Sequence, residues 1–218
     1  MTETKPSVVG RLQRGLETLY RVRTGLDVDV FMVGEQARHE ALGEGTTRRP
    51  REQLLVSEAS GELELGLFLD GDMLANLARH DPAAGLSEAN FWDFCLAVEG
   101  VSHFIYVALC AASDRSVTAL ELELQAEVDK FVSCTLLSPE RDTGALRERL
   151  YDHISLAADL DDTERARYRT ANDEAHRYAR SLDRRFIKSG QLGSMLAELR
   201  RFYRLSLTGK LHHIAQAA

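Results

Sequence analysis

Apolar residues recur at helical spacing over most of the chain. From Ser87 onward they return every three or four positions, which predicts almost continuous helix with short polar, proline or glycine breaks. Two further helices are expected upstream, one over residues 7–23 and one that starts at Asp70 or Asp72 and ends before Pro82. The helices expected after Ser87 cover residues 87–112, 115–137, 143–153, 162–188, 190–204 and 206–216.

One segment instead alternates apolar and other residues, as a half-buried strand does. Leucines occupy every second position of residues 62–69, and residues 52–57 form another apolar run before a turn at 58–61. This pattern predicts an antiparallel β-hairpin, which is marginal alone and must pack on the helices. Residues 28–33 are a candidate third strand. The polar, glycine-containing stretch 34–50 is expected to be a loop with room for a short helical turn.

Together these patterns predict a mainly α fold of the α+β kind, a multi-helix bundle with an N-terminal helix and a small antiparallel β-hairpin packed on it. We expect an N-terminal helix and hairpin subdomain over residues 1–70 and a helical bundle over 71–218, co-folded as one domain. A length of 218 residues and a hydrophobic content of 44% suffice for a core of this size.

The three cysteines lie in apolar, helix-like surroundings without a C-x-x-C pair. This pattern argues against both a disulfide framework and a zinc knuckle. The first residues of the chain lack the apolar core of a secretory signal. We therefore expect a cytoplasmic protein whose cysteines are reduced.

The most apolar stretch is FWDFCLAVEGVSHFIYVALCAA, residues 91–112. It is long enough to cross a membrane, but it contains Asp93 and Glu99, and each charge at the middle of a bilayer costs roughly 2.5–3.5 kcal/mol. We expect no membrane span here and instead a central, buried helix. Gly100 costs about 1 kcal/mol relative to alanine inside a helix, so another backbone is expected to approach it closely.

Polar and aromatic residues on one stripe of this helix form a candidate site. Glu99 and His103 lie one turn apart, and Trp92 and Tyr106 flank them as candidate binding residues. We favour a buried structural pair over two alternatives, an acid/base or ligand-orienting site and a metal site. Di-iron bundles carry Glu-x-x-His motifs on two helices, and this chain contains no such motif. No metal and no cofactor are therefore expected.

Two Arg–His pairs lie farther along the chain, Arg147 with His153 and Arg169 with His176. The spacing of the first pair resembles the Arg-x(4–6)-His motif of helical ribonucleases of the HEPN type. That resemblance implies a histidine that acts as acid or base and an arginine that stabilises the phosphorane. The residues directly after the two arginines depart from the family's pattern. An exposed helix surface is the alternative for both pairs.

Charge is distributed unevenly along the chain. The net charge is −7, yet residues 163–218 hold 12 Lys and Arg against 5 Asp and Glu. Near the end, Arg200, Arg201 and Arg204 alternate with Phe202 and Tyr203, a composition suited to phosphate contact and base stacking. We favour the simpler alternative, an amphipathic helix whose two aromatic residues pack on the core.

The sequence contains no P-loop, no dinucleotide-binding glycine motif, no H-E-x-x-H and no G-x-S-x-G. We therefore expect a non-enzymatic interaction or regulatory protein of the adaptor kind, with a protein partner and with self-association left open. One alternative is a helical nuclease or nucleic-acid binder that uses the basic C-terminal helices. The other is a helix-bundle enzyme or ligand binder centred on Glu99 and His103.

Overall fold

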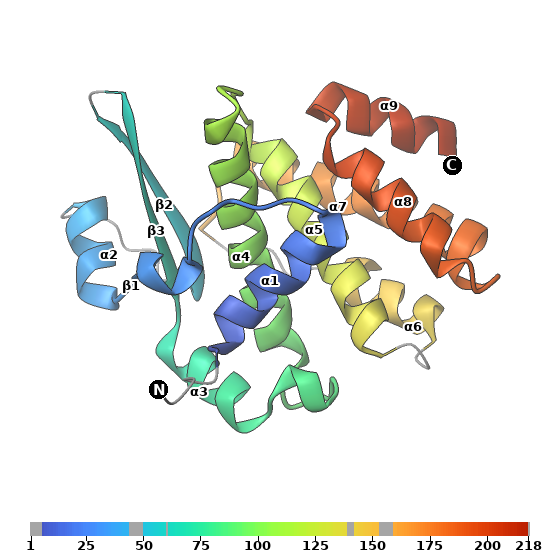
Figure 1. The fold of residues 1–218 in the computed structure, drawn as a ribbon, viewed down its shortest axis with the longest axis horizontal. Coiled ribbons are helices and arrows are strands. Elements are labelled where there is room, and N and C mark those ends of the chain that lie inside the picture. Colours follow the sequence, from blue (N-terminus) through green and yellow to red (C-terminus); the bar gives the residue numbers. More distant parts are fainter. Residues whose placement is uncertain (1–5, 44–49, 60, 139–141, 153–158, 218) are drawn as a thin grey trace. The chain divides into compact units, whose positions relative to one another are not determined.

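The computed structural model describes residues 6–43, 50–59, 61–138, 142–152 and 159–217 (Figure 1). These residues form a mainly helical fold with a small three-stranded sheet, which confirms the predicted fold class. The α-helices are α1 (Val8–Tyr20), α2 (Glu35–Leu42), α3 (Gly71–Arg79), α4 (Phe91–Ala112), α5 (Ala119–Leu137), α6 (Thr143–Arg147), α7 (Asp162–Leu182), α8 (Leu192–Tyr203) and α9 (Leu207–Ala217).

Short 3-10 and π-helical turns extend some of these elements. The 3-10 turns are η1 (Val28–Phe31) and η2 (Pro82–Ala84), and the π-helical turns are η3 (Glu148–Asp152) and η4 (Asp183–Ile187). The strands are β1 (Met32–Val33), β2 (Glu52–Ala59) and β3 (Glu62–Leu69). The two π-helical turns continue α6 and α7, so the helical stretches predicted over 143–153 and 162–188 are found, except that residue 153 lies outside the described residues.

Some local predictions need correction. Helix α4 starts at Phe91 rather than at residue 87, and α5 starts at Ala119 rather than at residue 115. In the candidate third strand, residues 28–33, a 3-10 turn takes up most of the segment, and the Asp27 side chain caps this turn by accepting a hydrogen bond from the backbone N–H of Asp29. Only Met32 and Val33 pair with a strand, β3, and they do so in parallel. Residues 35–42 were expected to be mainly loop but form helix α2, and residues 44–49 lie outside the described residues.

The chain divides into two compact units. Unit 1 comprises residues 1–17 and 23–115, and unit 2 comprises residues 18–22 and 116–218. The predicted division at residue 70 stays a prediction.

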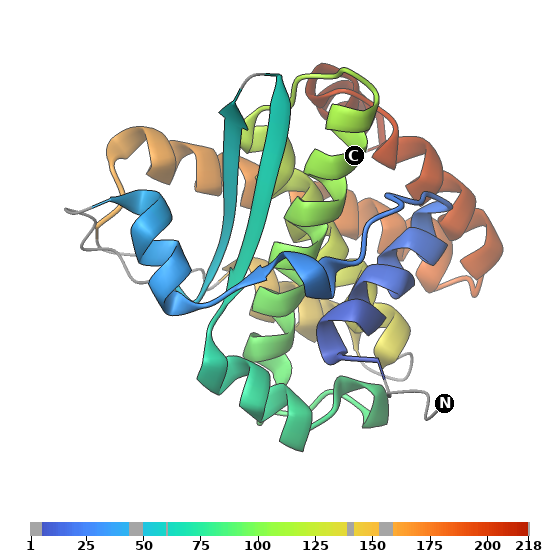
Figure 2. The ribbon, with the colours of Figure 1, turned by 60° about the vertical axis from the view of Figure 1, so that its left-hand side comes forward.

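The sheet of unit 1 has the strand order β1-β3-β2, with β2 antiparallel to β3 (Figure 2). Cross-strand partners share a face, so the register of Leu54 with Leu67 and of Val56 with Leu65 puts these four residues on one face. Helix α4 covers this face near the base of the hairpin, where the Leu67 side chain lies against Gly100. Arg38 of helix α2 contacts the opposite face through Phe68 and Gln53.

Helix α4 forms the core of unit 1. Its residues Phe91, Phe94 and Phe104 are fully buried. By length and composition alone it could cross a membrane, yet 78% of its most apolar window is buried inside the protein. That burial is what the core helix of a folded domain requires.

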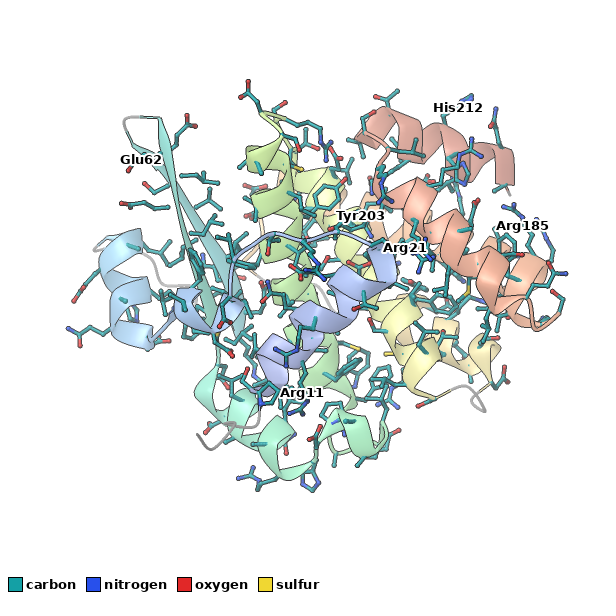
Figure 3. The ribbon with its side chains drawn as sticks, viewed as in Figure 1. Arg11, Arg21, Glu62, Arg185, Tyr203 and His212 are labelled. Carbon is teal, nitrogen blue, oxygen red and sulfur yellow. The ribbon has the colours of Figure 1, made fainter. Side chains whose placement is uncertain are left out.

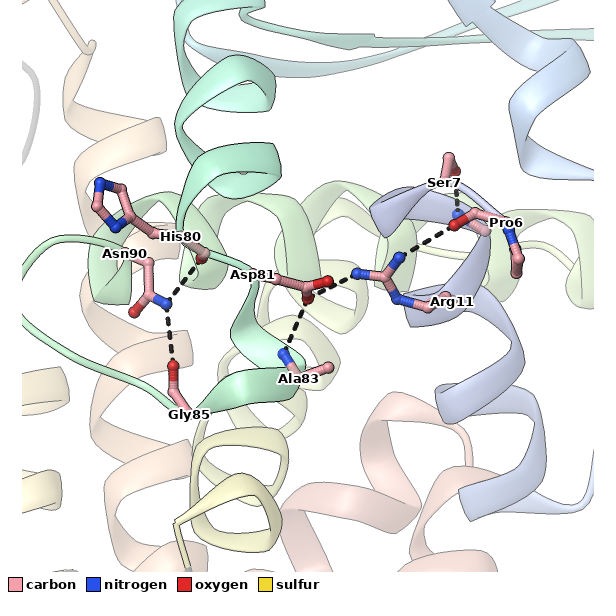
Figure 4. Close-up of polar contacts among 9 residues, drawn as sticks. Pro6, Ser7, Arg11, His80, Asp81, Ala83, Gly85 and Asn90 are labelled. Atoms are coloured by element: carbon pink, nitrogen blue, oxygen red, sulfur yellow. Dashed lines mark hydrogen bonds and ion pairs between the residues drawn. The ribbon is translucent and has the colours of Figure 1, made fainter. Parts of the chain in front are cut away.

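Polar contacts attach α1 of unit 1 to the segment between α3 and α4 (Figure 4). The Arg11 guanidinium donates to Asp81 at 2.6 Å, and Asp81 also accepts from the backbone N–H of Ala83 at 3.0 Å. The buried Asn90 amide donates to the carbonyl oxygens of His80 and Gly85, at 2.9 and 3.0 Å. The Asp81 and Asn90 side chains thus supply hydrogen-bond partners for backbone groups of this loop that would otherwise lack them.

Unit 2 is built from α5 to α9 together with residues 18–22, the end of α1 and the turn after it. Its core holds Phe131, Tyr178, Leu199 and Phe202, all less than 2% exposed. Helix α7 starts with a capping box, in which Asp161 and Glu164 each accept from the other's backbone N–H. This cap fixes where α7 begins, and the buried face that contains Ala175, Tyr178 and Leu182 stabilises the rest of this polar helix by packing in the core.

Candidate functional site

The α4 stripe meets the hairpin. His103 is buried, and its Nδ1 lies 3.7 Å from the Glu52 carboxylate of β2. Glu99, one turn earlier, is half-buried. The structure therefore adds Glu52, which sequence analysis missed, to the candidate site. The proposed pairing of Glu99 with His103 stays a prediction.

Gly100 lies at the closest approach between α4 and the hairpin. A Cβ atom at this position would come within 2.9 Å of Glu52 Cγ and 3.0 Å of Leu67 Cδ1. The predicted close approach is therefore present, but side chains of the hairpin make it rather than a second backbone. A larger residue at this position would force the Glu52 and Leu67 side chains to shift, which favours glycine here.

The aromatic residues of the stripe do not share one surface. Trp92 is 50% exposed and packs edge-on against Phe91 at the start of α4. Tyr106 is buried, and the guanidinium of Arg115 lies over its ring at 5.3 Å. A ligand in contact with Trp92 would therefore not reach Tyr106 directly.

In the first Arg–His pair, only Arg147 lies within the described residues, and it belongs to a buried ion pair. Arg147 donates to the buried Asp183 carboxylate at 2.6 Å, and Thr143 donates to the same group at 2.6 Å. Burial alone would raise the pKa of Asp183, but these hydrogen bonds and the Arg147 charge outweigh burial and lower the pKa. Arg147 thus holds α6 against η4, and His153 lies outside the described residues.

The two residues of the second pair lie in different environments. Arg169 is exposed on α7, whereas the His176 ring stacks on Tyr151 at 5.2 Å. His176 Nδ1 lies 3.5 Å from Asp152. Burial lowers the pKa of His176 below its ordinary value and outweighs the opposing effect of Asp152, and the Arg147 charge lowers it further. A neutral imidazole beside a carboxylate is capable of acid/base chemistry.

The basic and aromatic residues near the C-terminus have different structural roles. Phe202 and Tyr203 are buried, so the predicted packing on the core is confirmed. Arg200 Nε donates to the Leu19 carbonyl at 2.9 Å, and Arg204 donates to the Tyr20 carbonyl at 3.2 Å. These two arginines cap the end of α1, where unsatisfied carbonyl groups and the helix dipole favour cations. Arg201, which lies between them, is exposed.

A fully buried polar network lies in unit 2 and was missed by sequence analysis. Lys210 donates to the Gln125 side chain, and Gln125 donates to Asp129 at 2.9 Å and to the Tyr20 hydroxyl at 3.3 Å. Tyr20 in turn donates to Asp129. Burial, and then the Asp129 charge, raise the pKa of Tyr20 well above its ordinary value. These groups are satisfied by one another, which suits a structural role.

Aromatic rings enclose the cation of this network. The Lys210 ammonium lies 4.6 Å from the centre of the Phe202 ring and 5.6 Å from that of Tyr203, and Tyr203 stacks on Tyr20 at 4.0 Å. Cation–π contact compensates part of the cost of removing the ammonium from water. An isolated lysine in a polar helix gives no sequence signal for this environment.

The outer half of the β2–β3 hairpin is exposed to solvent. Val56 is 51% exposed and Leu63 is 38% exposed, and both lie on the face that α4 covers lower down. The opposite face carries the exposed carboxylates of Glu62 and Glu64. Within the described residues, β2 has a strand neighbour on one side only, and β1 pairs with no residue of β3 before Leu67.

The described residues contain no group of three His, Cys, Asp or Glu side chains placed to hold a metal ion. No known family model matches the chain, and no curated protein or solved structure resembles it significantly.

Proposed function

We propose that this chain is a non-enzymatic interaction protein that pairs an extended, basic segment of a protein partner with the open outer edge of β2. The proposal is carried by the exposed outer half of the hairpin, residues 56–58 and 61–64. An edge strand offers a row of backbone donors and acceptors that a further strand can use.

The side chains of the hairpin support a choice of partner. Residues 52–69 include glutamates at 52, 58, 62 and 64 and no lysine or arginine. Complementary charge steers association and suppresses wrong partners, so a lysine- or arginine-rich segment is favoured. The exposed Val56 and Leu63 offer apolar contacts, which favour a partner strand with apolar residues at alternate positions.

Natural proteins commonly protect exposed edges with charged side chains, proline or a covering element. The exposed part of β2 carries one charge, that of Glu58, and no proline. A basic partner strand would neutralise this charge and cover the edge.

The alternative of a helical nuclease finds support in His176, which is neutral and lies beside Asp152. Its arginine partner is the weaker element, because Arg147 is bound to Asp183 at 2.6 Å and Arg169 faces solvent. The interaction function therefore ranks first.

A site-specific crosslink tests the proposal. A photoreactive amino acid is placed at Ser57, which is exposed on β2, and at Ala84, which is exposed on η2 elsewhere in unit 1. In native cells, position 57 should capture a partner through a basic extended segment, and position 84 should not. Equal capture at both positions would contradict the proposal.

A matched pair of substitutions then tests the edge itself with the purified partner. Val56→Lys places a charge on the edge strand, whereas Val30→Lys makes the same change at a valine that is 78% exposed outside the sheet. Val56→Lys should weaken binding at least about tenfold, the loss expected when one central contact of an interface is removed. Val30→Lys should leave binding unchanged, and neither substitution should alter the melting temperature. Equal effects of the two would refute edge pairing.

A further inference from the structure

A pocket of about 390 Å³ opens on unit 2, between the turn η4, the end of α8 and the end of α9. Figure 3 labels Arg185 on η4 and His212 on α9, the two elements that contribute most of the pocket. Its lining residues are Arg184, Arg185, Arg201, His213, Gln216 and Ala217.

The lining is rich in hydrogen-bond donors. Its described residues provide three guanidinium groups, one imidazole and one primary amide, and no carboxylate among them lines the pocket. Glu198 contacts the lining, since it bonds to His213 Nε2 at 2.5 Å and lies 3.5 Å from Arg185. One acidic group is therefore set against three permanent positive charges.

The walls of the pocket are held in place by the fold. The Arg184 guanidinium and the Ser181 hydroxyl both donate to the Ala217 carbonyl at 2.9 Å, which fixes the end of α9 against α7 and η4. A hydrogen bond to Glu198 orients the His213 ring, and this ring also packs against the buried Tyr178. Across the described residues, the Arg201 side chain makes no hydrogen bond or ion pair and is exposed.

We propose that this pocket binds the phosphate group of a small phosphorylated molecule. Among the described residues, the lining arginines and Glu198 sum to two positive charges, and a phosphate monoester carries about −1.5 to −2 at neutral pH. Guanidinium groups offer paired N–H donors that match phosphate oxygens. The pocket is open to solvent, and its volume of about 390 Å³ has room for a phosphate group with a small body attached.

Nucleic acid is the less favoured source of phosphate. Single-stranded nucleic acid is held by exposed aromatic rings on which the bases stack. The aromatic residues near this pocket, Tyr178, Phe202 and Tyr203, are all buried. The site therefore offers charge without a stacking surface.

Calorimetric titration of the full-length chain at low salt tests the proposal, with inorganic phosphate, AMP and a short single-stranded RNA without a terminal phosphate as probes. AMP and inorganic phosphate should compete for one site. Arg201→Gln removes a lining charge that has no structural contact within the described residues, and it should weaken AMP binding about tenfold. Arg169→Gln removes an equally exposed charge from α7 outside the pocket and should change binding by less than about twofold.

Three results would overturn the phosphate site. One is the absence of AMP and phosphate binding to the folded wild-type chain. Another is an equal loss of affinity in the two arginine variants, which would indicate diffuse charge attraction. The third is tighter binding of the RNA than of AMP, which would assign the pocket to nucleic acid. Far-ultraviolet circular dichroism of each variant verifies that it is folded before titration.

Discussion

The buried network of unit 2 makes a quantitative prediction that uses two tyrosines in closely similar settings. Tyr20 and Tyr178 are both less than 2% exposed, and each stacks on an aromatic ring, Tyr203 at 4.0 Å and Phe202 at 4.1 Å. Their hydroxyl groups, however, lie in different environments. That of Tyr20 donates to Asp129 and accepts from Gln125, whereas that of Tyr178 has no hydrogen bond within the described residues.

Substitution of each tyrosine by phenylalanine isolates the hydroxyl, because the ring and its stacking are retained. Tyr20→Phe should lower the free energy of unfolding by about 2–3 kcal/mol, since a hydrogen bond to a charged group contributes about 1.5–3 kcal/mol and Gln125 also loses an acceptor. Tyr178→Phe should be neutral or should stabilise by up to about 1 kcal/mol, because it removes a buried polar group without a partner.

Urea titration followed by circular dichroism measures both changes, and thermal melting gives a second readout. For a chain of this length about 1 kcal/mol corresponds to roughly 2–4 °C, so Tyr20→Phe should lower the melting temperature by about 5–10 °C. Equal losses in the two variants, or a larger loss for Tyr178→Phe, would refute the structural interpretation of the network.

Further predictions concern Gly100, Asp183 and the two buried tyrosines. Gly100→Val should destabilise the protein by about 1–3 kcal/mol in urea titration, because the new side chain would overlap Glu52 of the hairpin; an unchanged midpoint would contradict the close approach. Asp183→Asn should cost roughly 3 kcal/mol, as the loss of one partner of a buried ion pair does. In the wild type the pKa of Asp183 is lowered, so its stabilisation should be present above about pH 4 and disappear as the pH falls through the folded-state pKa, as acid titration of stability would measure. The pKa values of Tyr20 and Tyr178 are raised, so both should stay protonated above pH 10 in the folded protein, and stability should fall as the pH rises beyond the ordinary tyrosine pKa of 10.0. Tyrosinate absorbance during alkaline titration measures this ionisation. If all six tyrosines ionised near pH 10 without unfolding, the prediction would be wrong.

Much of the fold could be predicted from local patterns. The helical period located α4, α5, α7, α8 and α9, and the alternation of leucines located β3, because each pattern depends on neighbouring residues. Helix α2 escaped prediction since it has few apolar residues and is ordered by contacts with the sheet. Its buried Arg38 lies over the Phe68 ring at 4.8 Å and donates to Gln53, and a polar helix gives no sign of such packing.

The candidate sites were less accessible from sequence because they join distant segments. Tyr20 and Asp129 are 109 residues apart, and Lys210 and Gln125 are 85 residues apart. Without knowledge of the tertiary fold, no periodicity connects them. The α4 stripe shows the same limit: helical spacing placed Glu99 and His103 on one face but could not supply Glu52 from the hairpin. The arginines at 200, 201 and 204 look alike in sequence, yet two cap α1 and one lines the phosphate pocket.

Hydrogen–deuterium exchange tests most directly whether the hairpin edge is the binding surface. The exchange of peptides that cover residues 52–69 is compared in the free protein and in the presence of the partner captured through Ser57. Pairing at the edge of β2 should slow exchange in the outer half of the hairpin, because backbone N–H groups gain acceptors. Val56→Lys should abolish this protection and Val30→Lys should not. Protection confined to other segments, with exchange of residues 52–69 unchanged, would contradict the proposed function.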